Sequence, residues 1–243
     1  MLYAIGDVHG QHEMLLQALA LIHADGGSDA QIVFVGDYVD RGPDSRAVIQ
    51  TLMDGQAAGK NWITLKGNHD RYVTRFLDDM IINDSATRPD LMWFNPRLGG
   101  DKTLLSYGVH AEDGKPVEPV HEAALKAVPK DHRTWLEHLP LTFETDDLFF
   151  CHAGIRPGIP LDQQVENDLI WIRQGWLEFN GTLPKQVIHG HTALEHPQHH
   201  GNRVNLDGGA GYFRPLHPAV YDDGDWYLLM PAGRIKLDPI PAE

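Results

Sequence analysis

The chain has 243 residues, of which 42% are hydrophobic and 22% are charged, the composition of an ordinary globular protein. Its formal net charge of −14 argues against nucleic acid or an anionic membrane as a general partner. The length predicts a single catalytic domain over residues 1–243. No apolar run reaches membrane-spanning length, Leu2–Ile5 follows Met1 without a leader, and the single Cys151 fits a reducing compartment, so we expect a cytoplasmic protein.

Three strand-loop-helix units open the chain. Strands are predicted at 2–5, 32–35 and 62–65, and amphipathic helices at 11–23, 45–56 and from about 68 to 82. The loops carry Asp7, Asp37 and Asn68, which are 30 and then 31 residues apart. Because parallel strands bring their carboxyl ends to one edge of a sheet, we expect these side chains to converge there.

The pattern changes between residues 83 and 140, where Trp, Pro and helix formers predict an inserted helical cap. Its expected helices lie at 91–95, 102–107 and 120–138. Strands resume at 141–143, 148–150, 186–188, 203–206, 219–221 and 226–229. His199 and His200 are predicted to form a solvated turn, and Pro239 and Pro241 to mark a loose tail.

Six side chains with oxygen or nitrogen donors follow the predicted strands: Asp7, His9, Asp37, Asn68, His152 and His191. Each has a structural reading by itself, since Asp37 could form a turn, Asn68 could cap a helix and any one histidine could be buried and hydrogen-bonded. Turn chemistry does not explain why all six precede glycine-rich turns. We therefore predict two divalent cations, one held by Asp7 and His9, the other by Asn68, His152 and His191, with Asp37 between them.

Five segments carry a resemblance to a known family. They are Gly6-Asp7-Val8-His9-Gly10, Gly36-Asp37-Tyr38-Val39-Asp40-Arg41-Gly42, Gly67-Asn68-His69-Asp70, His152-Ala153-Gly154 and Gly190-His191-Thr192. Together they resemble the calcineurin-like metallophosphoesterases, and within them the PPP-type serine/threonine phosphatases of the bacterial and bacteriophage lambda kind. The resemblance implies an α/β fold of two mixed β-sheets packed face to face with helices outside. It also implies two divalent metal ions, with manganese as the first expectation and iron, zinc or magnesium as alternatives.

Four further residues receive catalytic roles. Arg41 and Arg173 are predicted to hold the phosphoryl oxygens, because a guanidinium can meet two oxygens at once; the alternative for each is an ion pair with a carboxylate. By resemblance, His69 protonates the departing alkoxide, and Asp40 orients it and keeps it cationic. We expect His189 to lie near the metals without binding them.

The first functional hypothesis is a metal-dependent phosphatase acting on phosphomonoesters, foremost phosphoserine and phosphothreonine in proteins, by in-line attack of a hydroxide held between two cations. Asp70 stands where protein phosphatases commonly carry Glu, as it does in diadenosine tetraphosphatases. Asymmetric hydrolysis of dinucleoside polyphosphates, or of another small phosphoester, is therefore the alternative. A non-catalytic binding module is disfavoured because every predicted ligand is present, and the sequence leaves the oligomeric state open.

Overall fold

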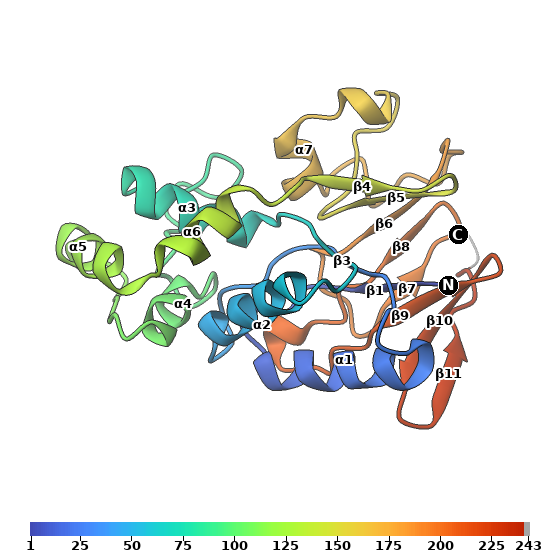
Figure 1. Cartoon of the computed structure of the whole chain (residues 1–243). Helices are drawn as coiled ribbons and strands as arrows, with labels where there is room; N and C mark the ends of the chain where they lie inside the picture. The colour runs from blue at the N-terminus through green and yellow to red at the C-terminus, as the bar shows by residue number, and fades with distance from the viewer. Residues whose placement is uncertain (241–243) are drawn as a thin grey trace.

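A computed structural model describes residues 1–240. Two mixed β-sheets pack face to face with helices on their outer sides, as the resemblance implied (Figure 1). The first sheet has the order β11-β10-β9-β1-β2-β3 and the second has the order β4-β5-β6-β8-β7. Within each sheet, three neighbouring strands run parallel: β1, β2 and β3 in the first, and β5, β6 and β8 in the second.

The strands are short, with three to six residues in most of them. Those of the first sheet are β1 (Leu2–Ile5), β2 (Ile32–Phe34), β3 (Trp62–Thr64), β9 (Ala219–Asp222), β10 (Asp225–Met230) and β11 (Gly233–Lys236). Those of the second sheet are β4 (Thr142–Glu144), β5 (Leu148–Cys151), β6 (Gln186–His189), β7 (Gln198–His199) and β8 (Arg203–Asn205). All nine predicted strands are present within about two residues, while β7 and β11 were not predicted.

The first two helices cover the outer side of the first sheet, and their sequence explains where they form. In α1 (His12–Gly26), Leu15, Ala18 and Ile22 recur three and four residues apart and are buried. In α2 (Ser45–Ala57), the Asp44 side chain caps the helix by accepting a hydrogen bond of 3.0 Å from the Ala47 amide. Both helices agree with the predicted ranges to within three residues at each end.

The cap region follows α3 (Asn68–Asp79) and contains α4 (Gly100–Ser106), α5 (Glu118–Ala127) and α6 (Lys130–Glu137). These helices gather at one end of the sheets (Figure 1). The predicted helix over 91–95 is wrong, because that segment folds as consecutive turns. The single helix predicted over 120–138 is two helices, because Pro129 cannot continue the hydrogen-bond ladder of α5 and instead precedes the first turn of α6.

Two predictions for the last fifty residues are corrected. His199 is not in a solvated turn but on β7, where its Nε2 lies 2.8 Å from Gln186 Nε2 and its Nδ1 lies 3.1 Å from the Leu237 carbonyl. Pro239 forms a bridge with His199, and the Ile240 amide donates to the His199 carbonyl at 2.7 Å, so the tail is held as far as residue 240. Pro241 lies outside the described residues.

The space between the two sheets is filled by aliphatic and aromatic side chains from both, among them Val33, Phe150, Ile188, Val204 and Trp226. A second buried cluster joins the outer face of the first sheet to α1, α2 and the cap helices. The inner faces of the two sheets cover each other, so polar side chains gather beyond the strand ends. The carboxyl ends of the parallel strands lie where the cap helices meet the sheets (Figure 1).

Candidate metal centre and active site

The loops at this edge hold an unusual backbone conformation. Five predicted site residues have positive φ angles: His9 (47°), Asp37 (55°), Asp40 (72°), Arg41 (67°) and His191 (67°). Over residues 1–240 only eight non-glycine residues do so. Positive φ disfavours any residue with a Cβ, and such strain persists only where surrounding contacts impose it, commonly at functional sites. The strain in this protein is concentrated on the loops that carry the predicted ligands.

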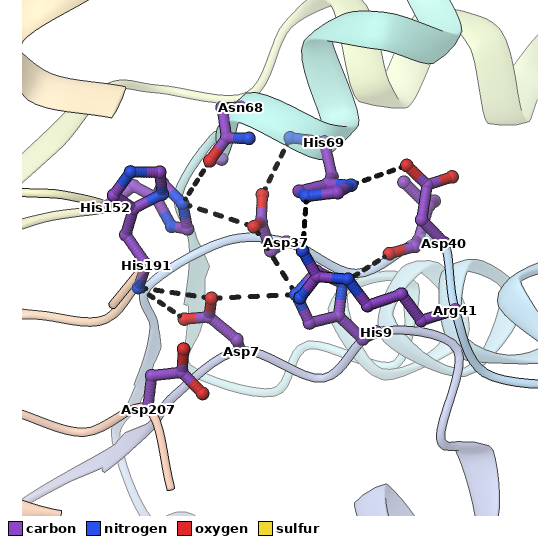
Figure 2. Close-up of polar contacts among 12 residues, drawn as sticks. Asp7, His9, Asp37, Asp40, Arg41, Asn68, His69, His152, His191 and Asp207 are labelled. Carbon is purple, nitrogen blue, oxygen red and sulfur yellow. Dashed lines mark hydrogen bonds and ion pairs between the residues drawn. The ribbon is translucent and has the colours of Figure 1, made fainter. Parts of the chain in front are cut away.

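Asp37 is the centre of the cluster (Figure 2). One of its carboxylate oxygens lies 3.7 Å from His9 Nε2 and 3.3 Å from His152 Nε2. The other accepts a hydrogen bond of 2.8 Å from the His69 backbone amide. The carboxylate therefore faces predicted ligands of both metal positions.

The ligands on either side of Asp37 also lie together. Asp7 is 3.8 Å from His9 Nε2, and Asn68 Oδ1 is 2.9 Å from His152 Nε2. The rings of His152 and His191 meet edge to face at 5.1 Å. The structure thus brings all six predicted metal ligands to one place, from five loops.

The donor atoms fit divalent cations. Two groups of three have donor atoms within 4.8 Å of one another: Asp37 with His152 and His191, and Asp37 with His9 and His69. His191 Nε2 is buried and has no hydrogen-bond partner among residues 1–240, which is the state expected of a nitrogen that binds a metal. The second group contains His69 in place of the predicted Asp7, whose carboxylate instead accepts the His191 amide at 3.0 and 3.1 Å.

Electrostatics also favour positive charge at this position. Burial pushes the pKa of Asp37 upward, but the neighbouring His152 and His69 outweigh it and hold that pKa well below its usual range. Burial would lower the pKa of His152, yet Asp37 and Asp7 raise it to about 9. Burial and the nearby Asp207 raise the pKa of Asp7 well above its usual range. A cluster of buried carboxylates that draws a proton onto a histidine provides the field that a divalent cation needs.

His69 and Asp40 form a close pair beside the ligands. His69 Nδ1 lies 2.6 Å from Asp40 Oδ2, and both side chains are buried. Burial lowers the pKa of His69 to about 3 and raises the pKa of Asp40 to about 8, so the site disfavours charge on each. The geometry agrees with an orienting role for Asp40, and a cationic His69 stays a prediction.

Two residues that hold Asp40 were missed in the sequence. Thr103 Oγ1 donates to Asp40 Oδ1 at 2.6 Å, and Trp93 Nε1 donates to Asp40 Oδ2 at 2.8 Å. Both come from the segment predicted to be a cap, more than 50 residues along the chain. No sequence pattern relates Thr103, which lies on α4, to the carboxylate of Asp40, so this hydrogen bond is visible only in the folded structure.

The two predicted phosphate-binding arginines face the cluster without a carboxylate partner. Arg41 Nη1 lies 2.8 Å from His9 Nε2 and its Nη2 lies 3.1 Å from His69 Nε2. Arg173 Nη2 donates to the His191 carbonyl at 3.3 Å. Neither guanidinium has a carboxylate within 4 Å over residues 1–240, so the predicted alternative of an ion pair is absent from the described chain.

Asp70 binds the backbone of the loops that carry the proposed ligands. Its carboxylate is buried and accepts backbone amides of Asp37 (2.9 Å), Tyr38 (2.9 Å) and Gly67 (2.8 Å). Burial raises the pKa of Asp70 to about 7 despite these donors. Asp70 therefore joins the Asp37 loop to the start of α3.

His189 and Asp207 lie just outside the cluster. His189 is buried with its ring 5.6 Å from that of Trp176 and its Nδ1 3.1 Å from the Gly190 carbonyl oxygen. Asp207 lies beside Asp7 (Figure 2) and accepts the Gly209 amide at 2.9 Å. Asp207 was not among the predicted site residues, and its position adds a further carboxylate to the field around Asp7.

A pair of mixed sheets with a carboxylate flanked by histidine and amide donors at the strand ends is the arrangement expected of a metal-dependent phosphoesterase. The chain belongs to the calcineurin-like phosphoesterase family, whose sequence profile matches residues 2–219. All of the candidate ligands fall inside that matched range.

Several curated relatives are bis(5'-nucleosyl)-tetraphosphatases. The symmetrical enzyme of Nitrosomonas europaea is 27% identical over 161 residues, which are 66% of this chain and 47% of that protein. The asymmetrical enzyme of Bacillus thuringiensis is 25% identical over an alignment of 234 positions, gaps included, which covers 85% of this chain and 84% of that protein. The chain thus spans about half the length of the symmetrical relatives it matches and most of the asymmetrical one.

Solved structures share the fold. A crystal structure described provisionally as a diadenosine tetraphosphatase has a TM-score of 0.66 at 21% identity, covering 97% of this chain and 92% of its own. The cold-active protein-tyrosine phosphatase of a Shewanella species has a TM-score of 0.62 at 16% identity, covering 98% and 80%. At these identities the likeness concerns the fold alone. Over residues 1–240, none of the helices has the length and apolar character needed to cross a membrane.

Proposed function

We propose that the protein hydrolyses dinucleoside polyphosphates, with diadenosine tetraphosphate cleaved by water to ATP and AMP. The observation that carries the reaction class is the position of Asp37 between two groups of nitrogen and amide donors at one sheet edge. The substrate class is supported by the relatives, because the asymmetrical tetraphosphatase matches over 84% of its own length. The first hypothesis, a protein serine/threonine phosphatase, becomes the second candidate. The whole chain, residues 1–243, would form one catalytic domain.

The proposed ligands are Asp7, His9 and Asp37 for one cation, and Asp37, Asn68, His152 and His191 for the other. Two divalent ions, with manganese as our first expectation, would supply charge neutralisation at the phosphoryl oxygens and a water that deprotonates near neutral pH. Asp37 would belong to both positions, because one of its carboxylate oxygens faces His9 on one side and His152 on the other. The Asp70 contacts to the backbone amides of Asp37 and Tyr38 would keep that carboxylate in place.

Arg41 and Arg173 would bind the phosphoryl group. Each lies beside a proposed ligand and has no carboxylate partner over residues 1–240, so its donors are available to phosphate oxygens. A guanidinium meets two oxygens with parallel hydrogen bonds, which fixes the orientation of the group as well as its charge. In the protein as described, Arg41 donates toward His9 and His69, and substrate binding would replace these contacts by contacts to oxygen.

His69 would give a proton to the departing oxygen. Its Nδ1 is tied to Asp40, which leaves Nε2 directed at the same space as Arg41 Nη2. The proton on Nε2 would go to the departing oxygen as the P–O bond breaks, while Nδ1 would take up the proton of its hydrogen bond with Asp40. This proton transfer should contribute little to kcat when the leaving group is a polyphosphate, which is a weak base. It should contribute much more when the leaving group is an alkoxide.

The second candidate, hydrolysis of phosphoserine or phosphothreonine in proteins, is favoured by the Tyr38-Val39-Asp40 and Ile170-Trp171-Ile172-Arg173 segments. These segments resemble the protein phosphatases of the bacterial and phage lambda kind. Both reactions would use the same centre at Asp37, so the two functions differ in the substrate that reaches it.

A comparison of kcat/KM separates the candidates. Enzyme reconstituted with manganese would be tested on diadenosine tetraphosphate and on a phosphothreonine peptide, with products separated by anion-exchange chromatography and Asp37→Asn as the inactive control. We expect higher kcat/KM on the dinucleotide, and ATP and AMP in equal amounts. Higher kcat/KM on the peptide would reject the dinucleotide assignment, and two molecules of ADP would reject the asymmetrical cleavage.

A further inference from the structure

A cleft of about 810 Å³ opens beside the candidate metal centre, between the cap and the loop before β9. His69 and Asn68 form part of its floor, so the cleft leads directly to the proposed reaction centre. Its volume lies within the range of roughly 300–1,000 Å³ that holds whole small molecules. A single phosphoryl group would fill only the end at His69.

The lining of the cleft is positively charged, whereas the protein as a whole is acidic. Four cationic side chains line it, namely Arg41, Arg173, Arg97 and Lys102, and none of its lining residues is an aspartate or a glutamate. The chain as a whole carries a formal net charge of −14. A local concentration of positive charge on an acidic protein directs anions to one place, because the rest of the surface repels them.

The cations form two pairs with different surroundings. Arg41 and Arg173 touch the proposed metal ligands. Arg97 and Lys102 lie on the cap side and are exposed, from the turn before α4 and from its first turn. Lys102 approaches Asp101 at 3.2 Å, and this half-exposed pair is a weak competitor for an arriving phosphate. Arg97 and Lys102 are not among the proposed metal ligands or catalytic residues.

Two aromatic side chains complete the wall of the cleft. Tyr212 and Phe213 end a short 3₁₀ helix, η2 (Ala210–Tyr212), and are 55% and 69% exposed. The Arg41 guanidinium lies 5.0 Å from the centre of the Tyr212 ring. Phe213 has a φ of 62°, a strained conformation for a bulky residue, and so joins the strained residues of the site. An exposed phenyl ring held in this way offers a flat face to a planar ligand.

We propose that this cleft binds a nucleoside polyphosphate, with the phosphates distant from the metal centre on Arg97 and Lys102 and a nucleobase stacked on Phe213. The inference rests on the proposed function and extends it by naming the residues that would select a long polyphosphate over a short phosphomonoester. Cationic side chains bind a phosphate chain, and an exposed aromatic ring stacks on a nucleobase, so the two kinds of side chain together recognise both parts of such a ligand.

The first experiment measures selectivity. Arg97→Gln, Lys102→Gln and Phe213→Ala would be assayed on diadenosine tetraphosphate and on p-nitrophenyl phosphate, with Lys115→Gln and Leu125→Ala as matched controls outside the cleft. We expect the ratio of kcat/KM on the dinucleotide to that on p-nitrophenyl phosphate to fall about tenfold for each loss of a phosphate contact and about fivefold for Phe213→Ala. The controls keep the wild-type ratio. An unaltered ratio in all three cleft variants would overturn the proposal.

The second experiment does not depend on turnover of the dinucleotide. ADP would be tested as a competitive inhibitor of p-nitrophenyl phosphate hydrolysis at one fixed free manganese concentration, in the wild type and in each variant. We expect the inhibition constant to rise at least fivefold in Arg97→Gln and Phe213→Ala and to stay constant in Lys115→Gln. If the wild type preferred a phosphopeptide, the proposed function would fail while this experiment still tested the cleft. Equal inhibition of all variants would show that ADP does not bind there.

Discussion

The His69→Asn variant gives the most informative perturbation of the proposed chemistry. An asparagine amide nitrogen can occupy the place of the imidazole Nδ1 and keep the hydrogen bond to Asp40, which is 2.6 Å long in the wild type. The substitution removes Nε2, the atom that lies 3.1 Å from Arg41 Nη2. It therefore separates proton transfer from the support of Asp40, because Trp93 and Thr103 still hold that carboxylate.

The expected loss depends on the leaving group. His69 is only 3% exposed, so bulk water cannot readily replace its proton. General acid catalysis contributes roughly 10²–10⁴-fold, or about 2.7–5.5 kcal/mol of activation free energy, and we expect kcat on an alkyl phosphate to fall by this amount. For p-nitrophenyl phosphate and diadenosine tetraphosphate, whose leaving groups are weak bases, we expect a loss of about tenfold or less.

A series of aryl and alkyl phosphates with rising leaving-group pKa measures this effect. The plot of log kcat against that pKa should be steeper for His69→Asn than for the wild type, while His110→Asn, an exposed histidine of the cap, should match the wild type. Metal content should stay constant. Equal losses over the whole series would refute the proton-transfer role, and loss of one metal would identify His69 as a ligand, as its place near His9 and Asp37 allows.

Three further predictions test the residues that support the site and the core. Thr103→Val keeps the shape of the side chain but removes its hydrogen bonds to the backbone amide and to the carboxylate of Asp40. We expect the free energy of unfolding to fall by about 1–3 kcal/mol, and kcat to fall as well. An unchanged urea unfolding curve would show that these hydrogen bonds do not stabilise the fold. Asp70→Asn turns an amide group toward three backbone donors, so we expect a similar destabilisation together with loss of bound metal, whereas retention of both would show that Asp70 does not hold the Asp37 loop. His132 is buried between Tyr107 and Gln50, and burial lowers its pKa. The unfolded chain takes up a proton at His132 below a pH of about 6.5 that the folded protein does not, so this residue costs stability as pH falls, by at most about 1.4 kcal/mol per pH unit. The difference in unfolding free energy between wild type and His132→Gln should therefore shrink from pH 7.5 to 5.5, and a constant difference would reject this reasoning.

The fold was predictable where the sequence carried a clear period or an interruption. Apolar runs before Asp7, Asp37 and Asn68 predicted β1, β2 and β3, because strands of a buried parallel sheet are nearly continuous hydrophobic runs. The cap was predicted less well. Its first segment, 91–95, contains helix formers but folds as turns, and Pro129 divides a helix that its neighbours favour. Strand β11 is largely exposed at a sheet edge, so it lacks the apolar signal by which strands are found.

The site was predictable to the extent that its residues follow strands. All six proposed ligands lie together, because each follows a strand that ends at the same edge. The spacing of one strand and one crossover helix accounts for Asp7, Asp37 and Asn68 alone. The contacts made across the fold could not be predicted. Trp93 and Thr103 reach Asp40 from the cap, and Asp70 accepts backbone amides of the Asp37 loop. Phe213 gave no signal at all, since its significance lies in exposure and backbone strain.

The central claim is that Asp37 joins two divalent cations. Elemental analysis of protein reconstituted with manganese and then freed of loose metal by gel filtration tests it directly, with Asp90→Asn, an exposed carboxylate, as the matched control. We predict about two manganese ions per chain in the wild type and the control, and fewer than about one in Asp37→Asn with an unchanged circular dichroism spectrum. Two ions retained by folded Asp37→Asn would contradict the account.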